Sequence, residues 1–215
     1  LPSFGIAFED DAVHDPEAML ANMRSFNRFV EDDWGYAHQN RIFGFPHLSL
    51  VDLDWAVEEL ERVLALGARG VILRAGPVYG RSPADPHFDP FWARLHEAGV
   101  TVAFHIAESG YNEMMSVWFG EQPNPSAHRQ SALQWSCFYG DRPIMDTIAA
   151  LVFHNLFGRY PNLKVVSVEN GSEWVQPLLR KLEKTYRQLP KMFPEPPLET
   201  LRRHLWVVPE YGEDI

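Results

Sequence analysis

The chain has 215 residues, of which 46% are hydrophobic and 13% aromatic. A chain of this kind can bury a large core, and no charged tail or Gly/Ser-rich linker divides it, so we expect one domain over residues 1–215. The formal net charge of −10 would repel a phosphate backbone, which excludes nucleic acid as an expected partner. No apolar run approaches the roughly 20 residues that cross a bilayer, so we expect no membrane association and a soluble, cytoplasmic protein.

The chain alternates short apolar runs with amphipathic segments. Runs of β-branched and aromatic residues predict strands over 3–8, 42–50, 70–74, 100–105, 164–168 and 205–208. Helical spacing of apolar residues predicts helices from 15, over 54–67, 89–98, 141–160 and 172–189, and from 199. Asp54 and Ser172 are the expected caps of two of these helices. Short strands separated by helices are typical of βα units in a parallel sheet.

A segment over residues 110–140 interrupts this alternation and is rich in aromatic residues, among them Trp118 and Trp135. A disordered linker would lack such residues. The segment is therefore predicted to be an ordered cover over the mouth of a pocket, with the two tryptophans as walls that contact a substrate.

About six strands fall short of the eight units and ~250 residues of a complete barrel. The sequence starts on the tail of one predicted strand and stops just after another. We therefore expect an α/β fold, a (β/α)8 TIM-type barrel that lacks its first and last strand units in the sequence given. A truncated form of a longer enzyme is the expected explanation, and a natural fragment that has lost the chemistry is the alternative.

Polar residues follow the predicted strands at the ends where α/β barrels place their chemistry. They are Glu9, His47, Arg74, His105 and Glu169 with Asn170. Histidine can supply a metal ligand, carboxylates can bind a metal or carry protons, and arginine can hold a substrate carboxylate. This set favours a metal-assisted reaction on an anionic substrate.

Each of these residues also has a simpler structural explanation. His105 could be a packed residue at a strand end, and His47 could be an exposed loop residue or one that supports the site from behind the residues that contact the ligand. Arg74 could pair with a neighbouring acid, while Glu169 either points into the mouth or pairs locally. The residues alone leave these alternatives open.

Several motifs that define a self-contained active site are absent from the sequence. It holds no His-x-His, His-Glu-x-x-His or Cys-x-x-Cys motif, no nucleophile elbow and no Gly-rich phosphate loop. The single cysteine, Cys137, excludes an internal disulfide and a multi-thiolate metal site. Of the other histidines, His204 is predicted at the surface and His154 packed in a helix.

Four segments carry a resemblance to a known family. They are FNRFVEDDWGY at 26–36, RIFGFP at 41–46, FDPFWARLHEAGVTVAFH at 88–105 and SVENGSEWV at 167–175. The chain resembles the amidohydrolase-2 family, the branch of the amidohydrolase superfamily that includes aminocarboxymuconate-semialdehyde decarboxylase and γ-resorcylate decarboxylase. The likeness runs over nearly the whole chain and keeps the order of the elements.

The resemblance implies a β/α barrel that holds one divalent metal, with zinc the expected ion. The family's ligands are a His-x-His or Glu-x-His pair on the first strand, a histidine on the fifth and an aspartate on the eighth. His105 matches the fifth-strand ligand, whereas the other ligands have no counterpart in the sequence given. The family's decarboxylases carry a proton-transfer histidine after the sixth strand, where this chain has Glu169.

The expected function is that of a metal-dependent decarboxylase or hydrolase acting on a small carboxylate-bearing cyclic or aromatic-derived substrate. Glu169 would be the catalytic proton carrier and His105 a metal ligand. The substrate would contact five residues: Arg74, Asn170, Trp118, Trp135 and His47. The 215 residues alone are expected to bind metal weakly or not at all, since their ligand set is incomplete.

The alternative from another class is a catalytically inactive barrel fragment or binding module without metal. A homodimer is compatible with the seven tryptophans, although burial of these side chains would explain them equally well.

Overall fold

The structure is a computed structural model that describes residue 9 and residues 14–107, 109–122, 130–138 and 141–213. Its helices are α2 (Pro16–Asp33), α3 (Leu53–Ala65), α4 (Asp89–Ala98), α5 (Tyr111–Phe119), α6 (Ala132–Phe138), α7 (Asp141–Phe153), α8 (Leu156–Arg159), α9 (Val175–Gln188) and α10 (Pro197–His204). Its strands are β1 (Gly70–Arg74), β2 (Thr101–His105), β3 (Lys164–Val168) and β4 (Leu205–Val207). Two 3-10 turns are η1 (Pro86–Phe88) and η2 (Pro190–Met192). The strand predicted over 3–8 lies outside the described residues.

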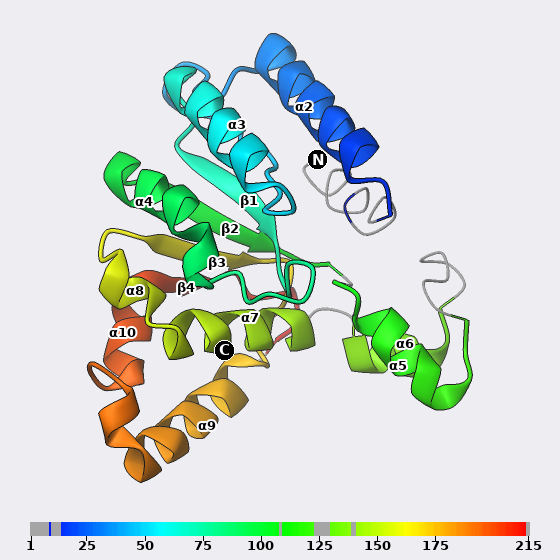
Figure 1. Cartoon of the computed structure of the whole chain (residues 1–215), viewed down its shortest axis with the longest axis vertical. Coiled ribbons are helices and arrows are strands. Elements are labelled where there is room, and N and C mark those ends of the chain that lie inside the picture. Colours follow the sequence, from blue (N-terminus) through cyan, green and yellow to red (C-terminus); the bar gives the residue numbers. More distant parts are fainter. Residues whose placement is uncertain (1–8, 10–13, 108, 123–129, 139–140, 214–215) are drawn as a thin grey trace.

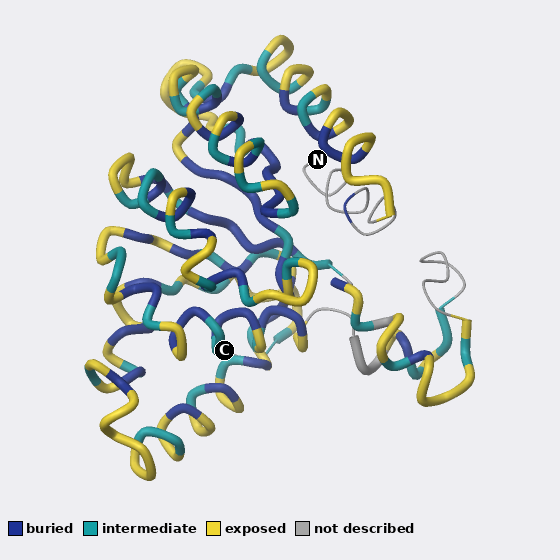
Figure 2. The backbone as a smooth tube through the Cα atoms, in the orientation of Figure 1, coloured by how far each residue is buried: buried dark blue, intermediate teal, exposed yellow. Residues whose placement is uncertain are grey.

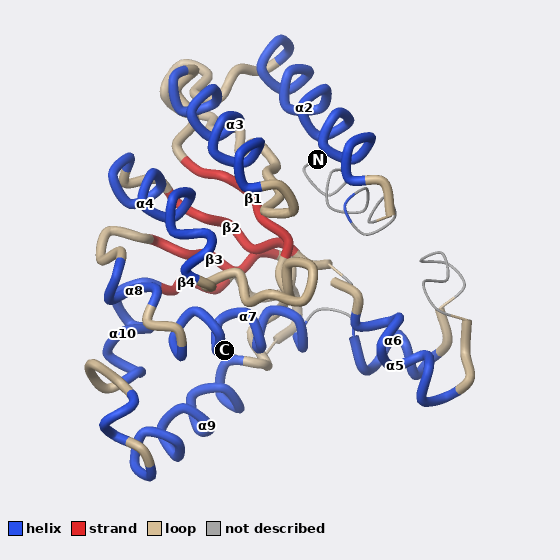
Figure 3. Tube along the Cα trace, viewed as in Figure 1, coloured by secondary structure: helices blue, strands red, loops and turns tan. Residues whose placement is uncertain are grey.

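The four strands form one parallel sheet in which the spatial order, β1-β2-β3-β4, is also the order along the chain. Each connection between neighbouring strands contains helix, as Figures 1 and 3 show. Consecutive parallel strands joined by helices are the repeating unit of a β/α barrel. The predicted fold class is confirmed: the chain is part of a (β/α)8 barrel.

The two faces of the sheet differ because successive strand residues point to opposite sides. One face packs against the helices and contributes Val71, Leu73, Val102, Phe104 and Val165 to the main hydrophobic core. The opposite face, which we call the inner face, carries Ile72 and Ala103 in a much smaller cluster. Alternation places Arg74 and His105 on this inner face as well. Figure 2 shows that β1 and β2 are mostly buried behind helices whose outer turns are exposed, whereas β3 and β4 are only partly buried.

The strand predicted over 42–50 is wrong in extent. Its parallel pairing is a single bridge between His47 and Ile72, with Ile72 N donating to Pro46 O (2.8 Å) and Leu48 N to Ile72 O (3.0 Å). The other edge of His47 is bonded by the side chain of Asn27 on α2, which accepts from His47 N and donates to His47 O, both at 2.9 Å. One buried side chain therefore satisfies both main-chain groups of His47 on the edge that faces away from β1.

The first helix boundaries follow local capping chemistry. α3 is capped by Asp52, whose side chain accepts from Trp55 N, and the predicted cap Asp54 lies in its first turn instead. α4 has the predicted bounds and ends at Gly99, which adopts a left-handed φ of 64°.

Three helix boundaries in the second half of the chain differ from the predicted ones. The helix predicted over 141–160 is two helices, α7 and α8, because Asn155 adopts φ 51° between them. α9 begins at Val175, and the predicted cap Ser172 bonds to Glu213 instead, with 2.8 Å between Ser172 Oγ and Glu213 Oε2. The helix expected from 199 begins at Pro197.

The segment 110–140 contains the helices α5 and α6, which extend away from the sheet in Figure 1. A buried hydrogen bond from Gln134 Nε2 to Ser116 Oγ (2.8 Å) joins them. Trp118 on α5 is 76% exposed and Trp135 on α6 is 56% exposed. The two tryptophans therefore face solvent in this structure.

Two histidine predictions are wrong. His204 is buried, stacks on Phe157 with 4.7 Å between ring centroids and hydrogen-bonds through Nδ1 to Leu163 O (2.8 Å). His154 is exposed, because α7 ends just before it. Among the described helices, none is both long enough and apolar enough to cross a bilayer.

Candidate active site

The inner face ends in polar residues at the carboxyl ends of the strands. Arg74 at the end of β1 is the register partner of His105 at the end of β2, and His105 is the partner of Val168 at the end of β3. Glu169 follows Val168 directly. Sequence reasoning placed these residues at one mouth, and the register brings Arg74, His105 and Glu169 to the same edge of the sheet.

His105 and Glu169 form a close pair. His105 Nε2 lies 3.0 Å from Glu169 Oε2, and His105 Nδ1 lies 3.3 Å from Ile106 O, so both ring nitrogens face oxygen atoms. The His105 side chain is 6% exposed, whereas the Glu169 side chain is 61% exposed. The carboxylate is therefore reachable from solvent, while the imidazole behind it is shielded.

Backbone strain accompanies this pair. Glu169 adopts φ 59°, the left-handed region that residues other than glycine rarely occupy. Such a conformation costs of order 1–3 kcal/mol and persists only where the surroundings fix it, which occurs often at functional sites.

A second polar cluster lies beside the pair and centres on Glu9. Glu9 accepts a hydrogen bond from Ser49 Oγ (2.6 Å), its Oε2 lies 3.1 Å from His47 Nε2, and its Oε1 lies 3.8 Å from Arg74 Nε. Burial alone would raise the pKa of the Glu9 carboxyl, but the bond to His47, the charge of Arg74 and the Ser49 hydroxyl together hold this pKa below its ordinary value. Glu9 is thus a buried carboxylate that is hydrogen-bonded to Ser49 and His47 and paired with the guanidinium of Arg74.

This cluster resolves two of the open alternatives. His47 is 1% exposed, so of its two alternatives the exposed one is wrong, while its contact with Glu9 agrees with a supporting position behind Arg74. Arg74 does pair with an acid, Glu9, and Arg74 Nη2 also donates to Pro77 O (3.1 Å). Sequence reasoning missed Ser49, although the alternation in His47-Leu48-Ser49 places it on the same face as His47.

Of the remaining predicted site residues, the two tryptophans lie apart from the pair, whereas Asn170 lies next to it. Trp118 and Trp135 face solvent on α5 and α6. Asn170 is buried beside the pair, and its amide nitrogen donates to Phe104 O (3.1 Å), Ser167 Oγ (3.1 Å) and Val168 O (2.9 Å). The structure therefore brings His105, Glu169 and Asn170 together, and His47 with Arg74, but not the two tryptophans.

Side chains join each loop at this edge to the next. Ser109 Oγ after β2 donates to Ala75 O after β1, and Asn170 after β3 donates to Phe104 O near the end of β2. Glu213, beyond β4, accepts from both Ser172 N and Ser172 Oγ at 2.8 Å. These contacts hold neighbouring loops in fixed relative positions.

Gly76 is the tightest point of this loop network. It adopts φ 102°, its N–H donates to Thr147 Oγ1 (2.6 Å), and a Cβ added to it would lie 2.4 Å from Ser109 Cβ. Gly80 also has a positive φ, 78°, but a Cβ there would meet nothing within 4 Å.

We expect Gly76→Ala to lower the free energy of unfolding more than Gly80→Ala does. Both changes impose left-handed strain of about 1 kcal/mol, and the clash with Ser109 adds about 1–3 kcal/mol at Gly76 alone. Urea denaturation of the two variants measures the difference. Equal losses would show that the Ser109 contact adjusts at no cost.

A metal centre here would use His105, and Glu169 is close enough to be a second ligand if it were not the proton carrier. Their 3.0 Å separation is what two ligands have when each is about 2.1 Å from one ion and the bonds are near a right angle. In the tautomer whose Nδ1–H donates to Ile106 O, Nε2 carries the lone pair that could bind a metal. Over the ranges that the structure describes, however, no group of three or more His, Cys, Asp or Glu side chains is placed to hold a metal ion. These residues thus offer two ligands and do not complete a site of three or four.

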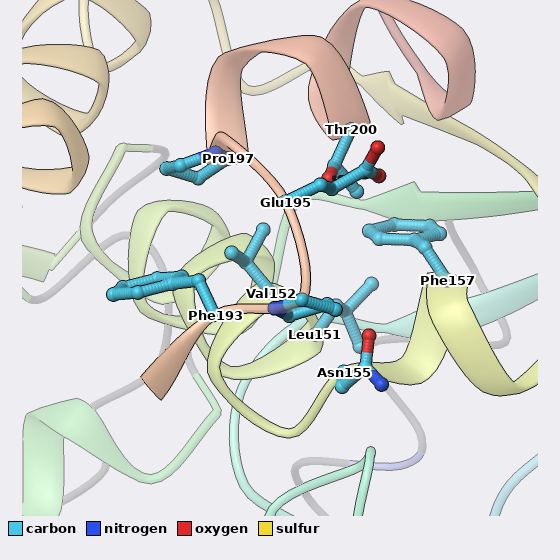
Figure 4. A pocket seen from close by; sticks show the side chains of 9 residues that line it. Leu151, Val152, Asn155, Phe157, Phe193, Glu195, Pro197 and Thr200 are labelled. Carbon is cyan, nitrogen blue, oxygen red and sulfur yellow. Dashed lines mark hydrogen bonds between the residues drawn. The ribbon is translucent and has the colours of Figure 1, made fainter. Parts of the chain in front are cut away.

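A small pocket lies elsewhere, between the end of α7, α8 and the start of α10 (Figure 4). Its volume of about 10 Å³ has room for roughly one water molecule. The carboxylate in its lining, Glu195, already accepts from Thr200 Oγ1 (2.7 Å) and pairs with Arg203. Because α8 and α10 precede β3 and β4, this pocket lies toward the amino ends of those strands, away from the His105–Glu169 pair.

The fold and the polar edge define a class of protein: a β/α barrel with ionisable side chains at the carboxyl ends of its strands. The sequence profile described as amidohydrolase matches residues 8–206. The chain belongs to the amidohydrolase family. No curated protein matches it.

Solved structures show the same fold. An amidohydrolase from Mycobacterium avium subsp. paratuberculosis K-10 is 41% identical, with a TM-score of 0.85 over 96% of this chain. Dihydroxybenzoic acid decarboxylase from Polaromonas sp. JS666, solved with manganese and 2-nitroresorcinol, is 20% identical, with a TM-score of 0.67 over 91% of this chain. 5-Carboxyvanillate decarboxylase from Sphingomonas paucimobilis is 21% identical, with a TM-score of 0.61 over 86% of this chain. The chain spans 53%, 58% and 52% of their lengths, about half of each.

Proposed function

We propose that the chain supplies part of the active site of a metal-dependent amidohydrolase-family enzyme, a decarboxylase or hydrolase for a small carboxylate-bearing cyclic or aromatic substrate. The observation that carries the proposal is the His105–Glu169 pair, 3.0 Å apart at the carboxyl ends of β2 and β3. Membership of the amidohydrolase family supports it. The bound manganese and the aromatic inhibitor of the Polaromonas decarboxylase agree with the metal and the substrate class.

Glu169 is the proposed proton carrier. Its carboxylate is exposed enough to meet a substrate, and its contact with His105 holds it at one side. A carboxyl group in this position can give a proton to a ring carbon as carbon dioxide leaves, or take one from water in a hydrolysis. The choice between the two reactions depends on the substrate and not on Glu169 itself.

His105 is the proposed metal ligand within this chain. A divalent ion would polarise a substrate oxygen or lower the pKa of a bound water. Zinc is the ion that the sequence resemblance implies, and manganese is the ion in the Polaromonas structure. His105 is the one ligand assigned to this chain in the proposal, so Glu169 remains available to carry the proton.

Arg74 is the proposed contact for a substrate carboxylate, with His47 supporting it through Glu9. Glu9 Oε1 lies 3.8 Å from Arg74 Nε, so a substrate carboxylate would share the guanidinium with Glu9 or displace it. Trp118 and Trp135 would reach a substrate only if α5 and α6 moved toward the inner face, because both side chains face solvent here.

The proposal is tested in the full-length protein that contains this chain. We expect a stoichiometric divalent metal by elemental analysis and its loss in His105→Ala, whereas His154→Ala at an exposed position retains it. Carbon dioxide release from hydroxybenzoates and muconate-type acids identifies a decarboxylase, and turnover of lactones without such release identifies a hydrolase. A full-length protein without metal, or with unchanged metal in His105→Ala, contradicts the proposal.

A further inference from the structure

Asn170 has an unusual position for a residue expected to bind substrate. Its side chain is almost fully buried, and its amide nitrogen is directed at three oxygen atoms of the protein: Phe104 O, Ser167 Oγ and Val168 O. This fixes the orientation of the amide, because the reverse orientation would set Oδ1 against two carbonyl oxygens, Phe104 O and Val168 O, which can only accept. Asn170 Oδ1 itself is buried without a hydrogen-bond partner among the described residues. The contribution of the side chain therefore comes from its nitrogen.

The two main-chain oxygens that Asn170 binds belong to the residues just before the active-site pair. Phe104 precedes His105 on β2, and Val168 precedes Glu169 on β3. One amide group thus connects the ends of the two strands at the residues from which the pair projects. The connection continues in the main chain, where Ile106 N donates to Val168 O at 3.2 Å.

The strain at Glu169 explains why such a connection is required. A glutamate at φ 59° would relax toward an ordinary backbone conformation if the chain after it were free. The bonds from the amide of the next residue, Asn170, to Phe104 O and Val168 O hold the chain in place and so keep the Glu169 carboxylate near His105 Nε2.

We infer that Asn170 is a positioning residue that sets the distance between His105 and Glu169, and that it does not bind substrate. The inference rests on the function proposed for that pair. Replacement of Asn170 should therefore change the environment of the His105 ring. It should also weaken the hydrogen bonding between the carboxyl ends of β2 and β3 more than the hydrogen bonding in the rest of the sheet.

The test compares Asn170→Leu and the smaller change Asn170→Ser with Asn27→Leu in the full-length protein. Asn27 is also a buried asparagine whose amide bonds to the main chain, but it lies on α2 and binds His47 O. In the Asn170 variants we expect exchange of the Ile106 amide hydrogen to accelerate at least tenfold relative to that of Ala103 in the middle of β2. We also expect the His105 ring-nitrogen resonances to shift from their wild-type positions when both proteins are compared at the same pH and metal content.

Asn27→Leu should leave the ratio of the Ile106 and Ala103 exchange rates and the His105 resonances as they are. The inference is overturned if the Asn170 variants leave both readouts unchanged, or if Asn27→Leu changes them equally, since the effect would then be general destabilisation. If Asn170→Leu does not fold, the same two measurements on Asn170→Ser decide whether the inference holds. Activity retained in His105→Ala and Glu169→Gln would refute the proposed function but leave the positional effect of Asn170 intact.

Discussion

Glu169→Gln is expected to lower kcat by about 10²–10⁴-fold, the usual contribution of a positioned general acid or base. Glutamine has the same shape and can still bond to His105 Nε2, so the backbone and the pair geometry should persist. What the variant loses is a group that can take up and release a proton. The measurement is steady-state turnover by the full-length protein on whichever substrate the activity panel identifies.

Glu173→Gln is the matched control for this change. Glu173 is exposed and lies four residues further along the same loop, at the approach to α9. Its neutralisation alters the net charge by the same amount and should leave kcat within a factor of about two. If Glu169→Gln also retained more than a tenth of wild-type kcat, Glu169 would not be the proton carrier.

Glu9→Gln is expected to lower the free energy of unfolding by about 3 kcal/mol at pH 7. This is near the lower end for breaking a buried ion pair, since glutamine keeps part of the hydrogen bonding to Ser49 and His47. The cause is that Arg74 and His47 lose the carboxylate that compensates their buried donors. Urea denaturation at pH 7 measures the loss.

The loss of unfolding free energy caused by Glu9→Gln should depend on pH in a definite direction. The pKa of Glu9 in the folded protein lies below the ordinary value of 4.5, so the folded state binds its proton less tightly than the unfolded chain does. Its stabilising contribution is therefore complete above pH 4.5 and is lost as the pH falls below 4.5 and through the folded pKa. The difference between wild type and Glu9→Gln should shrink over that interval.

Glu17→Gln on the exposed first turn of α2 provides the comparison. Its effect should stay below about 1 kcal/mol, as expected for a surface charge near a helix start. A difference between wild type and Glu9→Gln that is the same at pH 7 and pH 3 would show that Glu9 is not held as a carboxylate by its neighbours.

Much of the fold was predictable because its signals are local. The run Lys164–Val168 was predicted with its observed bounds, and the stop of α4 at Gly99 follows from the left-handed conformation that glycine adopts without cost. The predictions failed where a distant partner decides the outcome. The Asn27 side chain binds the main chain of His47, which was predicted to lie in a longer strand. The Ser172 hydroxyl, which was predicted to cap a helix, donates to Glu213 instead.

The candidate site divides in the same way. The sequence placed polar residues at strand ends, and the register confirms that Arg74 and His105 are partners on one face. The sequence alone did not determine which partner each of these side chains contacts. Arg74 is paired with Glu9, and His47 is buried behind that carboxylate, because Asn27 holds the main chain of His47 against the sheet.

The sequence by itself determined the alternation of strands and helices, the family resemblance and the residues at the carboxyl ends of the strands. These depend on periodicity, turn chemistry and short motifs, which act over a few residues. Only the tertiary structure decided that Glu169 reaches His105, that Glu9 joins His47 to Arg74, and that Asn170 bonds to both strand ends. Such contacts join residues far apart in the chain, and they form only once strand register and side-chain packing have fixed which groups share one buried space.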